Sequence, residues 1–232
     1  MTSQNNNKYL MLYSTTDGHT KTIMDTMAKQ IMEEAKVHCD VVNLDDGEKY
    51  DLGAYAKVML GASIRYGYFS KAFHAYTAKH ADELNSMPSA FFGVNLTARK
   101  EDKNTAMTNA YTRKFLNQSM WVPSLSGVFA GALWYPRYGL FDRVMIQFIM
   151  KVTGGETDAT KEVVYTDWDA VRKFASDFAK LPATSPPRSK PAGAAEASRL
   201  SAYGTGARVA LAVVGISAAV VVGRRLILAK RH

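Results

Sequence analysis

Hydrophobic positions between residues 8 and 181 alternate between short apolar runs and longer stretches with helical spacing. The apolar runs predict five buried strands, at residues 9–12, 38–44, 57–61, 89–94 and 125–132. The strand character of the fifth resumes at residues 162–166. The helical spacing predicts helices at residues 20–36, 70–84, 105–118 and 168–181. Such alternation is typical of an α/β fold, here a doubly wound, five-stranded parallel sheet with helices on both faces.

One segment, residues 133–156, does not follow this alternation and predicts an insert in the fifth strand. It contains aromatic and basic residues and then a short apolar helix. From Arg99 to Lys151 there are eight Lys and Arg residues and three acids. We interpret the insert as a surface for a flat, apolar molecule bearing carboxylates, or for an anionic membrane face. The simpler alternative is an extra packed helix with a solvated face.

The chain changes character after residue 181. Four of the seven prolines lie within residues 182–191, so residues 182–206 are interpreted as a linker. Residues 209–223 are uncharged and apolar, and residues 207–229 predict a C-terminal apolar helix that spans a membrane as a tail anchor. An interfacial helix is the alternative, because the apolar stretch is short. The single cysteine, Cys39, permits no internal disulfide and fits a reducing compartment.

The formal net charge of +8 is concentrated in this C-terminal part. Residues 182–232 hold eight Lys and Arg residues and one acid, so the rest of the chain is nearly neutral. The basicity is a property of the tail, and we therefore expect no nucleic-acid partner.

The loop at residues 14–20 lies between the first strand and the first helix, where free backbone N–H groups and the helix dipole favour an anion. It is rich in hydroxyl groups, and Gly18 allows close approach of the backbone to a ligand. It lacks the Lys-Ser/Thr of a Walker motif, which argues against a nucleoside triphosphate. The alternative is an ordinary N-cap turn. The loops at residues 62–69 and 95–103 are expected at the same edge of the sheet.

The spacing Thr15-x-x-Gly18-x-Thr20 after Tyr13 is similar to the flavodoxin phosphate loop, although Met24 replaces a usually small residue. Longer segments resemble the bacterial quinone-dependent protoporphyrinogen IX dehydrogenases, which are flavodoxin-like. These segments are residues 61–67, 85–91, 94–100, 131–138, 154–158 and 161–168. The resemblance covers about residues 8–181; the linker and the apolar tail depart from that family.

The resemblance implies FMN held by the first loop and flanked by the other two. The implied cofactor contacts are Ser14, Thr15, Thr16, Asp17, Gly18, His19, Thr20, Ala62, Ser63, Ile64, Arg65, Tyr66, Gly67, Asn95, Leu96, Thr97, Ala98, Arg99 and Lys100. Tyr66, Tyr68 and Phe69 are candidates for stacking on the flavin ring. No metal-ligand cluster or nucleophile–base pair stands out in the sequence. The resemblance implies that none is needed, because FMN carries the chemistry in this family.

The implied reaction is oxidation of protoporphyrinogen IX to protoporphyrin IX in haem synthesis, with three electron pairs passed to a membrane quinone. The insert residues Trp134, Arg137, Tyr138 and Arg143 are predicted at the substrate or membrane surface. Two alternatives are an NAD(P)H:quinone reductase and a non-enzymatic flavodoxin electron carrier. The anchor predicts attachment to a lipid bilayer, mitochondrial in a eukaryote and otherwise the inner membrane facing the cytoplasm. A homo-oligomer is left open.

Overall fold

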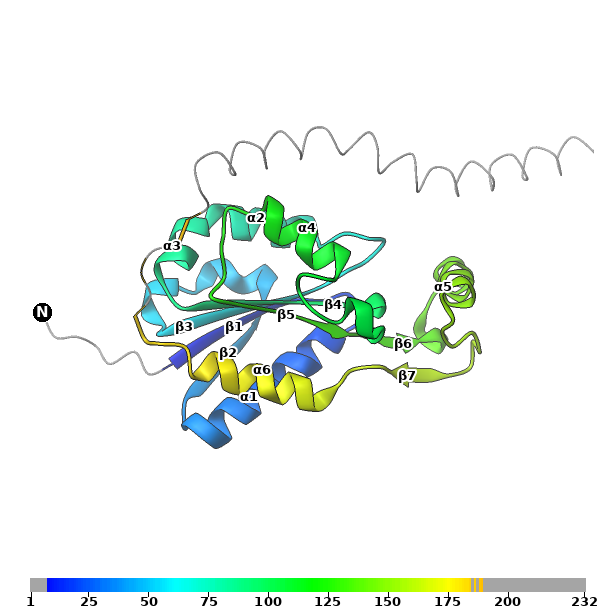
Figure 1. Ribbon diagram of the computed structural model, residues 1–232, viewed down its shortest axis with the longest axis horizontal. Coiled ribbons are helices and arrows are strands. Elements are labelled where there is room, and N and C mark those ends of the chain that lie inside the picture. The colour runs from blue at the N-terminus through cyan, green and yellow to red at the C-terminus, as the bar shows by residue number, and fades with distance from the viewer. Residues whose placement is uncertain (1–7, 185, 187, 190–232) are drawn as a thin grey trace, which may run out of the picture. The chain divides into compact units, whose positions relative to one another are not determined.

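The computed structural model describes residues 8–184, 186 and 188–189, and it contains a parallel sheet of five strands in the order β2-β1-β3-β4-β5 (Figure 1). The strands are β1 (Lys8–Ser14), β2 (His38–Asn43), β3 (Lys57–Ser63), β4 (Ser89–Asn95) and β5 (Leu125–Ala130). From β1 the chain continues to β2 on one side and then crosses to β3 on the other side. This switch, between β1 and β3, is where a doubly wound sheet opens a crevice for a ligand. The predicted fold class is confirmed.

Helices cover both faces of this sheet (Figure 1). On one face lie α1 (His19–Ala35) and α6 (Trp168–Ala179). On the other face lie α2 (Lys71–Lys79), α3 (Ala81–Ser86) and α4 (Ala110–Gln118). Short 3-10 helices occupy the connections: η1 (Leu44–Lys49), η2 (Leu52–Ala54), η3 (Leu96–Arg99), η4 (Glu101–Lys103) and η5 (Tyr135–Arg137).

Each face of the sheet has its own apolar layer. Ile23 and Met27 of α1 are fully buried with Phe178 of α6 in the first layer. Phe73 and Phe91 belong to the second layer, where their rings stack at a centroid distance of 5.6 Å. Each such side chain contributes about 1.5–3 kcal/mol through burial, so the two layers hold the helices against the sheet.

Two predicted helices differ in extent from the observed ones. The helix predicted at residues 70–84 is divided at His80 into α2 and α3. The helix predicted from residue 105 begins at Ala110, because the Asn109 side chain accepts a hydrogen bond from the Thr112 amide and caps it there. The preceding turn is closed by the hydroxyls of Thr105 and Thr108.

The insert is a small substructure of its own rather than an interruption of the fifth strand. It comprises β6 (Ala132–Trp134), α5 (Leu140–Thr153) and β7 (Glu162–Val164). β7 does not continue β5, as the apolar run at 162–166 had suggested; it pairs antiparallel with β6 in a separate two-stranded sheet. The chain enters the insert through β6 and returns through β7 in the opposite direction, and this requires antiparallel pairing.

Two basic side chains hold the chain at the amino ends of the strands. The ammonium of Lys57, 4% exposed, donates to the carbonyl oxygens of Ala179 and Leu181 at 2.6 Å each. Burial lowers the pKa of Lys57. Arg188 donates to the carbonyl oxygens of Met87 at 2.6 Å and Val122 at 2.7 Å. The ordered contacts of the domain therefore extend beyond α6 to residue 188.

No helix in the described part of the chain has the length and apolar character needed to cross a bilayer. The predicted tail at residues 207–229 lies outside the described residues, as does most of the predicted linker.

Candidate cofactor site

Three loops meet at the carboxyl ends of β1, β3 and β4. Ser14, at the end of β1, approaches Ser70 with 3.0 Å between their hydroxyl oxygens. The amide of Ile64, just after β3, donates to the carbonyl oxygen of Val94 in β4 at 2.9 Å. The predicted phosphate loop, the turn after β3 and the loop after β4 are therefore adjacent, as the parallel topology requires.

The start of α1 lacks a side-chain cap. Its N-cap residue, Gly18, has a φ of 83° and makes no side-chain capping hydrogen bond, whereas Ser70, Asn109 and Asp167 cap α2, α4 and α6. A β-carbon on Gly18 would meet no atom within 4 Å, so space is open beside the loop. A left-handed backbone with uncapped N–H groups is an arrangement that suits an anion at a helix start.

A buried hydroxyl without a partner marks the same loop. Oγ1 of Thr20 is fully buried and makes no hydrogen bond, whereas Oγ1 of Thr15 accepts from the Gly18 amide at 3.1 Å. An unsatisfied buried hydroxyl costs about 1–3 kcal/mol. A phosphate oxygen in the loop would accept this hydrogen bond, so the residues present fit the phosphate of a flavin mononucleotide.

His19, the first residue of α1, faces away from solvent and toward the insert. Its side chain is 7% exposed, and Nε2 lies 2.6 Å from Oγ1 of Thr166. The Thr166 hydroxyl donates its single hydrogen to the carbonyl oxygen of Ala130 at 2.7 Å, so the imidazole is the donor at Nε2. Trp134 and Trp168 meet the imidazole edge-on at centroid distances of 5.6 and 5.9 Å. Burial lowers the pKa of His19.

Of the three aromatic residues predicted to stack on the flavin ring, two lie exposed on the turn after β3. Tyr66 is 63% exposed and Tyr68 is 51% exposed. Phe69 is buried among the rings of Phe73, Phe91 and Phe115, so its assignment as a stacking residue was wrong. Its burial depends on rings from α2, β4 and α4, which the loop sequence alone does not reveal.

A left-handed turn holds those tyrosines out from the sheet. Tyr66 has a φ of 51° and Gly67 a φ of 86°, and Arg65 and Tyr68 exchange backbone hydrogen bonds of 2.9 and 3.1 Å across the turn. A bulky residue with positive φ is an uncommon conformation, which the surrounding contacts must maintain.

The loop after β4 is organised from within. Oδ1 of Asn95, a buried side chain, accepts from Oγ1 of Thr97 at 2.6 Å and from the Ala98 amide at 3.1 Å. Asn109 of α4 joins the network by donating to the same oxygen at 3.1 Å. The side chain of Asn95 therefore shapes this loop, and the backbone of residues 96–100 is what the loop offers to a ligand.

The four predicted insert residues divide into two kinds. Trp134 and Arg137 stack, with 4.4 Å from the guanidinium carbon to the ring centroid, and Arg137 also pairs with Glu162 at 2.9 Å. Arg143 donates from Nη2 to the carbonyl oxygen of Tyr138 at 3.4 Å, while its buried Nε has no partner. Among the described residues Arg143 has no ion-pair partner, unlike Arg137, and Tyr138 is buried.

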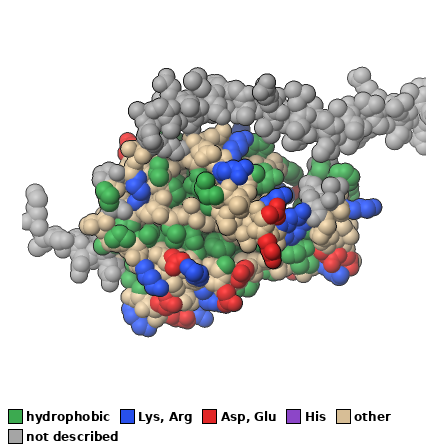
Figure 2. Space-filling model, in the orientation of Figure 1, with side chains coloured by type: hydrophobic (Ala, Val, Ile, Leu, Met, Phe, Trp, Pro, Cys, Tyr) green, Lys and Arg blue, Asp and Glu red, His purple; other side chains and the backbone are tan. Residues whose placement is uncertain are grey.

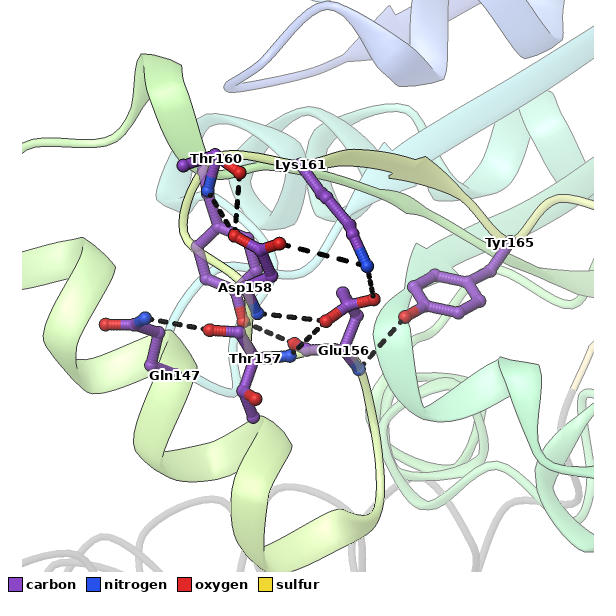
Figure 3. A network of polar contacts seen from close by, with 8 residues as sticks. Gln147, Glu156, Thr157, Asp158, Thr160, Lys161 and Tyr165 are labelled. Carbon is purple, nitrogen blue, oxygen red and sulfur yellow. Dashed lines mark hydrogen bonds and ion pairs between the residues drawn. The ribbon is translucent and has the colours of Figure 1, made fainter.

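The connection between α5 and β7 is a polar network (Figure 3). The Glu156 carboxylate accepts from the amides of Thr157 and Asp158 and from the Lys161 ammonium at 2.9–3.0 Å. Gln147 of α5 donates to the carbonyl oxygen of Thr157 at 2.8 Å. These contacts fix the insert internally, so it is a preformed element rather than a loose loop.

The outer face of α5 is apolar. Leu140, Val144 and Phe148, spaced by four residues, are 81%, 65% and 53% exposed. Elsewhere, on the face drawn in Figure 2, acidic and basic side chains are interspersed, without a broad region of one sign. An exposed apolar row of this kind is a candidate interaction site.

Comparison with known proteins identifies the class first: the chain belongs to the flavodoxin domain family, which matches residues 10–160. Within that class it belongs with the protoporphyrinogen IX dehydrogenases (quinone), an oxidoreductase family. The protein of that name from Leishmania major is 68% identical over 224 residues, 97% of both chains. The protein of that name from Escherichia coli K12 is 51% identical over 174 residues, 75% of this chain and 96% of its own.

Among solved structures, oxidised flavodoxin 1 from Bacillus cereus is similar over 75% of this chain and 99% of its own, at 15% identity with a TM-score of 0.44. The resemblance found in the sequence is thus confirmed at the level of the family by the two relatives. The individual cofactor contacts predicted above stay predictions.

The pKa of the His19 imidazole should be lower than that of an exposed histidine. Burial lowers the pKa of this imidazole, so near its titration range the folded protein holds less of the charged form than an exposed histidine does. The unfolded state then binds more protons, so this contribution to stability is complete above about pH 6.5 and is lost as the pH falls through the folded pKa. NMR titration of the imidazole resonances measures the pKa directly.

A matched pair of variants checks the link to stability. Urea unfolding at pH 7.5 and 5.5 should show a smaller loss on acidification for His19→Gln, which keeps an N–H donor but cannot titrate. His38→Gln, at an exposed position on β2, is the control. An imidazole that titrates at the normal value would show that His19 is not held as described.

Proposed function

We propose that this chain binds FMN at the carboxyl edge of its sheet and oxidises protoporphyrinogen IX to protoporphyrin IX, with the electrons passed to a membrane quinone. The observation that carries the cofactor assignment is the partnerless Thr20 hydroxyl at the uncapped start of α1. The names of the two relatives support the substrate and the acceptor class.

In this proposal the residues of the chain bind and orient, and bound FMN supplies the redox chemistry by accepting two electrons at a time from the porphyrinogen. Thr15, Thr20 and the amides that start α1 hold the phosphate. The loops after β3 and β4 border the ring, with Tyr66 and Tyr68 as the exposed aromatic surfaces. His19 and Thr166 join the phosphate loop to the end of the insert.

The insert supplies the porphyrinogen site. Porphyrinogens of this type are apolar rings with two propionate carboxylates, and the insert combines an exposed apolar row with an arginine that has unused donors. A guanidinium recognises a carboxylate through paired N–H donors, which suits Arg143. Arg137 is already paired with Glu162, so it is the weaker candidate of the two.

The decisive experiment is anaerobic stopped-flow absorbance of the flavin-loaded protein. Loss of the oxidised-flavin absorbance on mixing with protoporphyrinogen IX, and its recovery on adding a quinone, is the expected result. Reduction by NADH or NADPH but not by the porphyrinogen would identify a nicotinamide-dependent reductase instead. Absence of reduction by either donor would indicate an electron carrier that depends on a protein partner.

Thr20→Val should weaken FMN binding by about 10- to 100-fold, because it removes a hydrogen bond to a charged phosphate while preserving side-chain shape. Quenching of flavin fluorescence on titration with apoprotein measures the dissociation constant. Thr22→Ala removes an exposed hydroxyl from the same helix and serves as the control. Equal affinities for wild type and Thr20→Val would remove Thr20 from the phosphate site.

Arg143→Gln should raise the KM for protoporphyrinogen about tenfold and leave FMN affinity unchanged, because one charge-assisted carboxylate contact is lost. Steady-state oxidation with a soluble quinone separates KM from kcat. Lys151→Gln, which removes an exposed charge near the end of α5, is the matched control. If both variants shift KM equally, the effect is general electrostatics and not recognition by Arg143.

We further propose that residues 207–229 anchor the enzyme to a membrane, which is mitochondrial if the cell is eukaryotic, so that the flavin site stays near a lipid-soluble acceptor. The Leishmania major relative matches 97% of this chain, so the match extends into that tail, whereas the Escherichia coli relative covers 75%. The full chain should stay in the membrane fraction after carbonate extraction at high pH.

The comparison protein should end at Ser189, because ending at Leu181 would remove the Arg188 contacts as well. This shortened protein should be released from the membrane and keep its rate with a soluble quinone. Release of both proteins by carbonate would contradict an integral anchor.

A further inference from the structure

Arg65 connects the phosphate loop with the insert. From the turn after β3, its Nη1 lies 3.1 Å from Oδ1 of Asp17, and its Nη2 lies 2.5 Å from Oδ2 of Asp142. The second carboxylate oxygen of Asp142 accepts a hydrogen bond from the Tyr66 hydroxyl. Three segments far apart in the sequence are therefore joined through one guanidinium.

Asp142 has a second reason to lie where it does. It is the acidic residue in the first turn of α5, whose N-cap residue Gly139 makes no side-chain capping hydrogen bond. A carboxylate there is stabilised by the positive end of the helix dipole. Its side chain is 22% exposed and that of Arg65 is 29% exposed, so the pair is more shielded from solvent than the Arg137–Glu162 pair at 58% and 44%.

We propose that Asp142 is a positioning residue: by binding Arg65 and Tyr66 it fixes the first turn of α5 to the cofactor loops, so that cofactor binding and ordering of the insert are coupled. Asp17 is held when an anion orders the phosphate loop, Asp17 orients Arg65, and Arg65 orients Asp142. The coupling is reciprocal, because two equilibria linked through one contact shift each other by the same factor.

The same contacts have an electrostatic purpose. Asp17 and Asp142 place two carboxylates close to a loop that we assign to a phosphate dianion. Arg65 neutralises part of that charge by pairing with both. Neutralising Asp142 therefore has two opposed effects on FMN affinity: it removes a like charge near the phosphate, and it removes the coupling through Arg65. The protection of the insert by FMN, rather than the FMN affinity, reports the role of Asp142.

The test is amide hydrogen exchange of the full-length protein, without and with FMN, for wild type and Asp142→Asn. We expect the variant to exchange about threefold or more faster over residues 140–146 without the cofactor, since the helix start opens more often. In wild type FMN should slow exchange at residues 14–20 and also at 140–146. In Asp142→Asn, at saturating FMN, the first effect should persist and the second should be lost.

Glu162→Gln is the matched control, because it breaks an ion pair inside the same insert that involves neither Arg65 nor Asp142. Exchange of the β1 and β3 amides reports whether each variant is folded. The proposal is overturned if residues 140–146 exchange at the wild-type rate in Asp142→Asn, or if FMN still protects them there as it does in wild type. The second arm rests on the proposed FMN site: failure of every variant to bind FMN would count against that site, while the cofactor-free arm would still decide the role of Asp142.

Discussion

The candidate cofactor site depends on the start of α1, where hydrogen-bond donors have no partner within the protein. α1 follows β1, which pairs with β2 on one side and β3 on the other, so the loop between strand and helix is fixed by the middle of the sheet. The helix begins at a left-handed glycine without a side-chain cap, and a buried threonine hydroxyl beside it has no partner. Folding therefore leaves donors that the protein itself does not use, and an anion completes them. The loops after β3 and β4 have their own internal contacts, and their position follows from the register of the strands.

The sequence predicted the sheet well, and it predicted that the loops after β1, β3 and β4 lie together, because buried parallel strands are continuous apolar runs and their carboxyl ends share one edge. It did not predict which side chains of these loops are exposed to a ligand. Phe69 and Asn95 lie in predicted site loops, yet one packs into the core and the other ties its own loop together. Such outcomes depend on residues distant in the sequence, such as Phe115 and Asn109. The pairing of β6 with β7 was not predicted either, because strands of three residues carry almost no periodic signal.

The insert shows how a common fold acquires a particular function. Its interior is a small apolar cluster around Tyr135 and Met150, and its polar connection is closed by Glu156. Its contacts with the sheet domain near the phosphate loop include His19 with Trp134 and Thr166, and Arg65 with Asp142. A preformed insert held at both its ends and its helix start can present a surface at a fixed place relative to the cofactor loops, which a flexible loop cannot do.

Arg188 determines where the rest of the chain leaves the domain. Its hydrogen bonds to Met87 and Val122 place that exit at the amino ends of β4 and β5, the opposite edge of the sheet from the cofactor loops. A membrane anchor beyond Ser189 would thus be attached at the rear of the catalytic edge. Such an attachment raises the local concentration of the domain at a bilayer without choosing its orientation. The apolar row of Leu140, Val144 and Phe148 belongs instead to the insert, whose contacts with His19 and Arg65 lie at the other edge of the sheet.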